Sequence, residues 1–347
     1  MNSVQSQNPQ KYYSLNQYAD VRKIDMHLHL NTGETTLIDL AKEDKFKILS
    51  INVDYPAFPP VDEQQQITEK LSGLHPNRVG FVGTFLMDGW DENGWEEKVI
   101  AQIDDVIERG AVGIKVWKNI GMDFRDESGE LVFIDDPKFD PVFDHIRDLN
   151  IPLIGHLGEP KDCWLSLDNM IVDYNRDYFR EHPEYHMYKH PELPSYEDQI
   201  SARDRMLEKH SDLTFIGAHF GSLEWSVEEM AKFLDRFPRA MLDSAARMGA
   251  IQYQTAQERN PVRKFFIKYQ DRLMYATDFF QESGEDQNQF RQDAHAKWLS
   301  DWQFLVTDDS MKVGDIKESF HGLHLPVSIV DKIYRGNALR VFPGAWE

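Results

Sequence analysis

The residues of this chain that are best suited to chemistry are two histidines near its N-terminal end, His27 and His29. They lie in residues 21–30, where apolar and polar side chains alternate. This alternation predicts a β-strand, and residues two apart on a strand point to the same side. Neutral imidazole nitrogen is a preferred ligand of zinc and similar divalent cations. The pair therefore indicates a metal site, although two exposed histidines at a strand edge would give the same pattern.

Four more polar residues occur within or at the end of short apolar segments: Lys115, His156, His219 and Asp278. If these segments are parallel strands of a closed barrel, their carboxyl ends meet at one cavity. Simpler explanations exist, because a histidine at a strand end is ordinarily just hydrogen-bonded and a strand-terminal aspartate often caps a helix. Lys115 is harder to explain, since a lysine in a central strand needs a partner. It either pairs with a carboxylate or captures CO₂ and becomes a bridging carbamate.

The elements that must position these residues form a regular series. Apolar stripes at helical spacing, such as Val99, Ile103 and Val106 before Gly110, lie between eight apolar segments typical of buried parallel strands. The pattern predicts an α/β fold, a (β/α)₈ TIM barrel forming one domain over residues 1–347, with a polar extension at 1–20 and long loops after strands five (159–195) and eight (279–307). An open doubly wound sheet is the alternative, but no G-x-G-x-x-G follows the first strand. The predicted strands are Ile24–His29, Phe46–Val53, Val79–Phe85, Val112–Trp117, Pro152–Leu157, Leu213–His219, Ala240–Ala245 and Leu273–Asp278.

The overall composition excludes several classes of protein. The formal charge of −21 argues against nucleic acid or an anionic membrane as a partner, because both require a positive field. No apolar run approaches the ~18 residues of a membrane helix, and residues 1–20 contain no apolar signal core. The single cysteine, Cys163, is typical of a reducing compartment. We therefore expect a cytoplasmic protein that acts on a small-molecule substrate, with homo-oligomerisation left open.

Taken together, these features resemble the amidohydrolase superfamily over nearly the whole chain. Residues 25–29 (DMHLH) are similar to its first-strand metal motif, and His156, His219 and Asp278 match positions on strands five, six and eight. Residues 333–342 (IYRGNALRVF) are similar to the closing helix of its decarboxylase-like branch, amidohydrolase family 2. Lys115 departs from the many members of that branch that hold one metal. It is more like the dihydroorotase type, in which a carboxylated lysine bridges two metals.

The resemblance implies a divalent cofactor and a hydrolytic function. Zinc is expected, with manganese, iron or cobalt as alternatives, and the cation would make hydroxide available near neutral pH. Asp278 would pass a proton from water to the leaving group, and His219 would ligate a second metal or polarise the substrate carbonyl. We expect cleavage of a C–O or C–N bond in a small carboxylate-bearing lactone or amide. Decarboxylation of an aromatic or unsaturated acid is the alternative, and a catalytically silent metal-binding barrel is the second. One or two ions would be held by His27, His29, Lys115, His156, His219 and Asp278.

Candidate substrate-binding residues follow the predicted strands four and seven. Arg247 and Lys118 could bind a substrate carboxylate, although surface salt bridges are equally compatible with their positions. Trp117 could pack against a substrate ring, or could simply be part of the core. Neither a second metal site nor a cysteine nucleophile is expected from the remaining candidates, which are His182, His186, His190 and Cys163.

Overall fold

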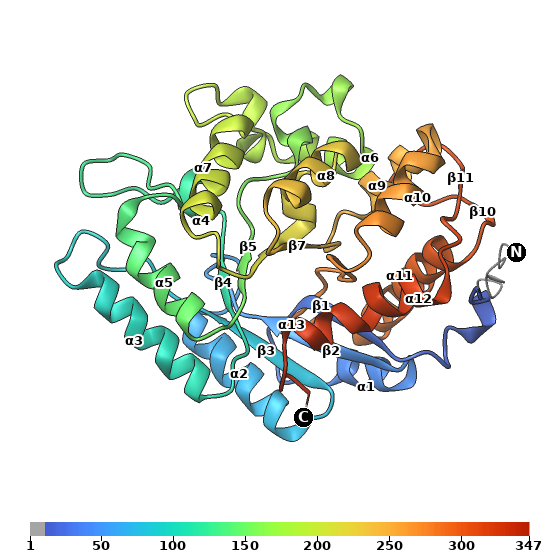
Figure 1. Cartoon of the computed structure of the whole chain (residues 1–347), viewed down its shortest axis with the longest axis horizontal. Helices are drawn as coiled ribbons and strands as arrows, with labels where there is room; N and C mark the ends of the chain where they lie inside the picture. The colour runs from blue at the N-terminus through green and yellow to red at the C-terminus, as the bar shows by residue number, and fades with distance from the viewer. Residues whose placement is uncertain (1–10, 347) are drawn as a thin grey trace, which may run out of the picture.

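The computed structural model describes residues 11–346 and contains a parallel sheet built from all eight predicted strand segments. The strands follow one another around the sheet in chain order, each parallel to its neighbour. This arrangement, with helices between the strands, confirms the predicted α/β barrel (Figure 1). The strands are β1 (Lys23–Leu30), β2 (Phe46–Ile51), β3 (Val79–Thr84), β4 (Ile114–Val116), β5 (Leu153–Gly155), β6 (Phe215–Gly217), β7 (Ala240–Asp243), β8 (Leu273–Met274) and β9 (Phe280–Gln281).

The segment that contains β8 and β9 joins the two ends of the sheet. β8 pairs with β7, and β9 pairs with the end of β1. Between them, the backbone N–H of Met26 donates to the carbonyl of Tyr275 (3.1 Å), and that of Asp278 donates to the carbonyl of His27 (2.8 Å). The predicted eighth strand therefore closes the ring, with a break in its regular structure at the residues that approach the cavity.

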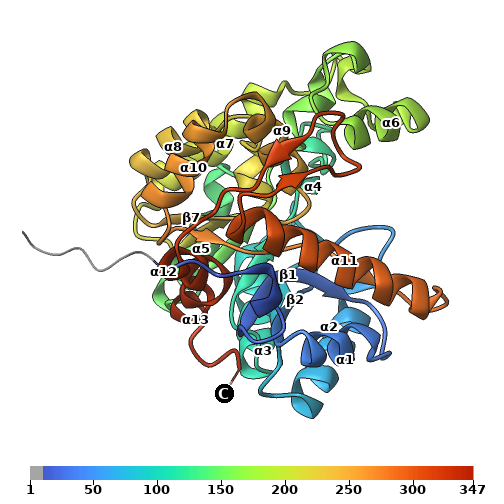
Figure 2. The same cartoon turned by 90° about the vertical axis from the view of Figure 1, so that its right-hand side faces the viewer.

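Helices cover the outside of the sheet, and α2, α3 and α5 lie side by side in Figure 1. The predicted stripes are confirmed, since Val99, Ile103 and Val106 are buried in α3. The connection after β8 is long, as predicted, but it consists largely of the helix α11, which runs beside β1 and β2 in Figure 2. Among residues 11–346, no helix has the length and apolar character needed to cross a membrane. The helices are α1 (Thr36–Glu43), α2 (Val61–Leu74), α3 (Trp95–Glu108), α4 (Asn119–Met122), α5 (Asp140–Asp148), α6 (Asp173–Glu181), α7 (Tyr196–Lys209), α8 (Val227–Arg236), α9 (Met248–Gln257), α10 (Arg259–Lys268), α11 (Gln287–Val306), α12 (Val327–Asp331) and α13 (Asn337–Val341).

An irregularity in β1 reverses the side to which its residues point. The pairing of β1 with β2 shifts register between Asp25 and Leu28. Before the shift, Met26 belongs to the core inside the barrel, whereas Leu28 after it belongs to the core under the helices. Such a bulge changes the parity of a strand. The sequence predicted one regular alternation, and the bulge is what turns His27 and His29 into the barrel while Asp25 points outward.

The C-terminal residues seal the barrel at the end opposite the cavity. The side-chain amide of Asn337 donates to the carbonyl of Leu273 (2.7 Å), and Nε1 of Trp346 donates to the carbonyl of Ile48 (2.9 Å). Phe342 and Trp346 complete the apolar core inside the strands. The helix anticipated over residues 333–342 is therefore the floor beneath the candidate site.

Candidate active site

A cavity of about 400 Å³ opens at the carboxyl ends of the strands. All six residues predicted to bind metal line this cavity, so the structure brings together what the sequence separates by up to 251 positions. The remainder of the wall is largely aromatic. Its lining residues beyond the six are Val53, Tyr55, Ala57, Phe58, Trp117, Lys118, Tyr174, Tyr178, Phe280 and Glu282.

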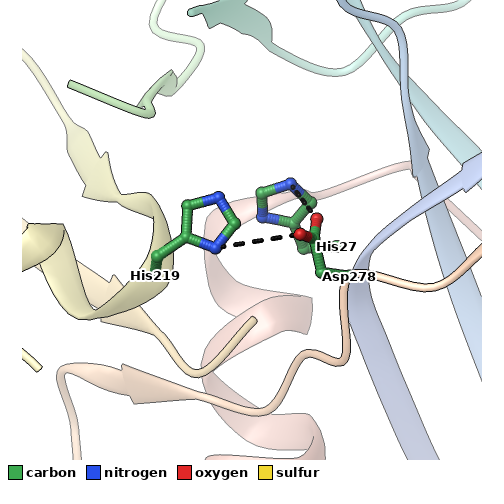
Figure 3. A group of neighbouring side chains, drawn as sticks. All are labelled: His27, His219 and Asp278. Atoms are coloured by element: carbon green, nitrogen blue, oxygen red, sulfur yellow. Dashed lines mark ion pairs between the residues drawn. The ribbon is translucent and has the colours of Figure 1, made fainter. Parts of the chain in front are cut away.

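His27, His29 and Asp278 meet at the end of β1. Oδ1 of Asp278 lies 3.3 Å from Nε2 of His27 and 3.3 Å from Nε2 of His29. Asp278 has a φ of 68°, in the left-handed region, and its backbone N–H is bonded to the carbonyl of His27. This sparsely populated backbone conformation is held by β1, and it directs the carboxylate at both imidazoles. Figure 3 shows its approach to His27.

His219 reaches the same place from a tight turn after β6. Residues 219–222 all have positive φ values, between 55° and 65°. The wholly buried guanidinium of Arg203 donates to the carbonyl of Gly221, and the hydroxyl of Tyr196 donates to the carbonyl of Ser222 (2.6 Å). These bonds stabilise a turn that would otherwise be strained. The turn places Nδ1 of His219 4.0 Å from Oδ2 of Asp278 (Figure 3).

Backbone carbonyls fix the protonated nitrogen of two of these histidines. Nδ1 of His29 lies 2.6 Å from the carbonyl of Ile51, and Nδ1 of His219 lies 2.9 Å from the carbonyl of Ala245. A carbonyl can only accept, so each Nδ1 carries the hydrogen, and Nε2 of the neutral ring carries the lone pair. The outer hydrogen bond thus sets the face that each ring presents to the cavity.

The same logic extends from His219 to His156. Nδ1 of His156 lies 3.1 Å from Nε2 of His219, which must accept, so His156 donates from Nδ1. Nε2 of neutral His156 is then an unprotonated acceptor. It is buried and has no hydrogen-bond partner within residues 11–346. A buried nitrogen lone pair without a partner is costly unless a ligand occupies it.

Two carboxylates that orient the site were not identified from the sequence. Asp243, the last residue of β7, accepts from Nδ1 of His27 with Oδ2 (2.9 Å) and from the backbone N–H of His219 with Oδ1 (2.8 Å). Asp25 points away from the cavity and accepts from the hydroxyl of Thr277 (2.6 Å), beside Asp278. The available signal for Asp243 was its position, because it is a buried carboxylate within the predicted seventh strand, Ala240–Ala245.

The comparisons with known proteins decide the family. The family model Amidohydro_2, described as amidohydrolase, matches residues 75–344. The chain belongs to this amidohydrolase family. No curated protein matches the sequence.

Solved structures share the fold of this amidohydrolase at low sequence identity. The 2,6-dihydroxybenzoate decarboxylase from Rhizobium is 14% identical, with a TM-score of 0.53, and the match covers 92% of this chain and 98% of that one. The decarboxylase complexed with 2,6-dihydroxybenzoate gives a TM-score of 0.54 at the same identity and coverage. A protein named amidohydrolase II is 15% identical over 92% of this chain and 99% of its own, with a TM-score of 0.51. At these identities the similarity establishes the fold alone.

The family is typically metal-dependent, and the arrangement of donors in this member suits a divalent cation. His27, His219 and Asp278 each offer a ligand atom, and these atoms lie within 4.8 Å of one another. Each of the two histidines also has an outer partner at Nδ1, Asp243 for His27 and the carbonyl of Ala245 for His219. Metal-binding histidines are commonly oriented in this way by a carboxylate or a backbone carbonyl. The residues present therefore fit a metal ion.

The protonation states favour the same conclusion. Burial lowers the pKa of His219 to about 3, against the opposing charge of Asp278, and burial together with nearby Lys115 lowers the pKa of His27. Burial alone would raise the pKa of Asp278, but the surrounding imidazoles outweigh it and hold that pKa well below its usual range. Neutral imidazoles beside an ionised carboxylate are the ligand-ready state of such a site.

Lys115 lies between two groups of candidate ligands. Its Nζ is 3.3 Å from Nε2 of His27, and its side chain is 1% exposed. Burial lowers the pKa of Lys115 to about 8, although Asp243 and Asp278 oppose the shift. In the described part of the chain, no carboxylate forms an ion pair with this lysine. The first explanation offered by the sequence, pairing with a carboxylate, is therefore not what the structure contains.

Two of the three predicted substrate-binding residues line the cavity, and the third does not. Trp117 and Lys118 line the cavity, where Lys118 forms an ion pair with Glu159. Arg247 is not among the lining residues, and its buried Nε has no partner in residues 11–346. The roles of all three stay predictions.

The other residues considered from the sequence lie outside the cavity. Cys163 is buried, and burial raises its pKa to about 12, which makes it a poor nucleophile. The loop histidines form no metal cluster within the described residues, and their contacts are local. His182 pairs with Glu184, His190 pairs with Glu192, and His186 contacts the carbonyl of Leu165.

Proposed function

We propose that this amidohydrolase is a metal-dependent hydrolase that cleaves a C–O or C–N bond in a small carboxylate-bearing lactone or amide. The observation that carries the proposal is the meeting of two donor groups in one cavity. His27, His29 and Asp278 form the first group, and His156 with His219 forms the second. Lys115 lies between them, 3.3 Å from His27. A hydrolytic centre needs such a dense set of nitrogen and oxygen donors, because it must hold cations and still leave room for water.

Zinc is the cation that we propose, because the donors are imidazole and carboxylate without thiolate; manganese, iron and cobalt accept a similar set. When bound, such an ion acidifies a water molecule and polarises a carbonyl group. His29 and His219 would contribute Nε2, since their Nδ1–H groups donate to backbone carbonyls, and the ion would take the place of the hydrogen bond that Nε2 of His219 accepts from His156. This tautomer supports a ligand role for His219 over a role as donor to the substrate carbonyl.

The ionised Asp278 would act as the proton carrier. Its side chain is 27% exposed and lines the cavity, so it reaches both the buried histidines and a substrate in the cavity. In this role, Oδ1 or Oδ2 accepts a proton from the attacking water and returns it to the leaving oxygen or nitrogen. Lys118 at the cavity wall would bind the substrate carboxylate after separating from Glu159, and Trp117 would pack against its ring.

Decarboxylation of an aromatic acid is the second candidate, supported by the aromatic wall of the cavity. Tyr55, Phe58 and Trp117 offer flat faces for a ring beside the histidines. A solved structure with the same fold is that of a decarboxylase bound to 2,6-dihydroxybenzoate. A third candidate is a catalytically silent metal-binding barrel. It is disfavoured because it leaves the carboxylate of Asp278 at the mouth of the site without a function.

One screen separates these functions. Zinc-loaded protein is incubated with carboxylate-bearing lactones and amides while acid release is followed, and with aromatic carboxylic acids while CO₂ release is followed. We expect acid release that disappears on chelation and in Asp278→Asn. Release of CO₂ alone would replace the proposal with decarboxylation, and metal binding without either activity would support the silent barrel.

A further inference from the structure

Exposed aromatic side chains are concentrated beside the cavity. Tyrosines 174, 178 and 185 are 62%, 37% and 57% exposed, and Phe280 is 49% exposed. Tyr174, Tyr178 and Phe280 also line the cavity that contains Asp278. Apolar surface of this kind is costly to leave in water, and contiguous patches usually mark a binding site. Because the exposed aromatic patch is continuous with the cavity, we expect it to bind the same substrate that enters the cavity.

The three tyrosines form a row on the long connection after β5. Tyr178 of α6 lies nearly parallel to Tyr174, with ring centroids 6.5 Å apart at 20°, and nearly parallel to Tyr185, at 6.4 Å and 11°. The cavity wall has its own series of ring contacts. There, Phe58 packs 5.0 Å from the ring of His29 and 5.0 Å from that of Tyr55. Both series of aromatic rings therefore line one cavity, and Tyr174 and Tyr178 are its exposed members on this connection.

We propose that Tyr174, Tyr178 and Tyr185, the outer tyrosine row, bind a second, planar aromatic ring of the substrate. This inference rests on the proposed function and narrows it to substrates that carry an aryl group beyond the bond that is cleaved. Water adds to the carbonyl carbon, the C–O or C–N bond breaks, and the leaving group takes the proton. The aryl group takes no part in this chemistry and supplies binding energy.

The geometry favours an aromatic ring over other occupants. Tyrosine rings provide a large contact area at low entropic cost, and parallel ring faces stack with planar π-systems. An aliphatic chain would need an enclosed groove, whereas these rings are 37–62% exposed. A protein partner would not need the row to continue into a cavity lined by His27 and Asp278.

Tyr188 provides a matched control within the same connection. It is 57% exposed, as Tyr185 is, but it does not line the cavity, and its ring contacts His186. Removing its ring therefore changes exposed aromatic area without touching the outer tyrosine row.

The test measures equilibrium binding and needs no turnover. Zinc-loaded holoprotein is titrated with benzoate, para-phenylbenzoate, para-benzyloxybenzoate and para-cyclohexylbenzoate. We expect one of the two diaryl acids to bind roughly five- to tenfold more tightly than benzoate and than the cyclohexyl acid, as expected for an added ring stack. Tyr178→Ala should abolish this advantage, whereas Tyr178→Phe and Tyr188→Ala should keep it.

Equal binding of the cyclohexyl and diaryl acids would overturn the inference, as would equal losses in Tyr178→Ala and Tyr188→Ala. Dissociation of an oligomer in Tyr178→Ala would also overturn it, because the row would then be an interface between copies of the chain. Failure of the proposed function gives a different result. If the protein prefers aryl ligands but hydrolyses nothing, the outer tyrosine row is kept as a binding site and only the hydrolase function is rejected. If it hydrolyses substrates without preferring aryl ligands, the hydrolase function is kept and the binding role of the row is rejected.

Discussion

Oδ2 of Asp243 lies 2.9 Å from Nδ1 of His27, and the other oxygen of the same carboxylate accepts the backbone N–H of His219 (2.8 Å). One buried side chain at the end of β7 therefore orients a ligand on β1 and the turn that follows β6. Asp243 is 0% exposed, so no water can substitute for it.

Asp243→Asn should weaken metal binding by roughly 10- to 100-fold, because an amide can no longer accept at both oxygens and one partner must be lost. The measurement is the zinc dissociation constant from competition with a chromogenic chelator. The control is Asp212→Asn at an exposed position, which should leave the constant unchanged. Unaltered zinc affinity in Asp243→Asn would contradict the role that the structure gives to this carboxylate.

Removing the metal should lower thermal stability without unfolding the barrel. A ligand that binds only the folded state stabilises it by ~2.7 kcal/mol when present at 100 times its dissociation constant. We expect the Tm to fall when zinc is chelated and to recover when zinc is added back, with far-ultraviolet circular dichroism unchanged. Elemental analysis should find one or two divalent ions per chain. His27→Ala should bind little zinc, and its Tm should be insensitive to chelator.

Asp278→Asn should lower kcat by a factor on the order of 10² to 10⁴, the usual contribution of a positioned acid–base group. KM should change little, because the amide has nearly the same shape. Steady-state kinetics on the best substrate from the screen tests this expectation. The partly buried Glu282, which lines the same cavity, provides a control, because Glu282→Gln removes a second carboxylate charge from the wall without changing the proposed proton carrier. Comparable losses in both variants would argue for a change in electrostatic potential in place of proton transfer.

The barrel was predictable because parallel strands buried on both faces leave long apolar runs in the sequence. The candidate ligands were predictable because a polar residue at the end of such a run is unusual. The bulge in β1 was not predictable, since Ile24, Met26, Leu28 and Leu30 alternate without interruption. Only the pairing with β2 reveals that Ile24 and Met26 point into the barrel, whereas Leu28 and Leu30 point outward.

Two further features, the helix α11 and the role of Asp243, were not predicted, although the sequence contains a signal for the helix. In α11, Ala294, Trp298 and Trp302 are buried at a spacing of four, which is a helical stripe within a mostly polar segment. Asp243 lies within a predicted apolar strand, where a carboxylate is as unusual as the lysine at position 115. Its contacts with His27 and His219 depend on the way β7, β6 and β1 meet around the ring, and a sequence does not contain those distances.

Lys115 should determine the number of metal ions. It is buried between the two donor groups, without an ion pair in the described residues, and a carbamate would provide the missing anion. Its neutral amine would add to CO₂, with release of one proton, and form a carbamate anion. Protein prepared with bicarbonate and excess zinc should then hold two ions per chain and show the mass of an added CO₂. Lys115→Met should hold one. A crystal structure with one ion at full occupancy and an unmodified Lys115, prepared in the same way, would reject the carbamate.

Glu224 should make thermal stability depend on pH at a site away from the candidate ligands. It is 3% exposed, Oε1 accepts the backbone N–H of Lys161 (3.1 Å), and Oε2 has no partner in residues 11–346. Burial raises its pKa from 4.5 to about 7, against the opposing charge of Arg247. Between these two values the unfolded chain is ionised while the folded chain holds the proton, so this group lowers stability progressively as pH rises from 4.5 to 7.

Glu224→Gln mimics the protonated form and retains an acceptor for Lys161. The Tm of this variant should be close to that of the wild type near pH 4.5 and should exceed it increasingly up to about pH 7, after which the difference should level off. The stabilisation at high pH should be about 3 kcal/mol. Differential scanning calorimetry of the metal-free proteins measures it, and the other titrating groups cancel in the difference between variant and wild type. Glu228→Gln, at an exposed position four residues further along the chain, should show no such dependence. A difference that is constant between pH 4.5 and 8, or one that decreases, would show that Glu224 is ionised in the folded protein with a partner that compensates its charge.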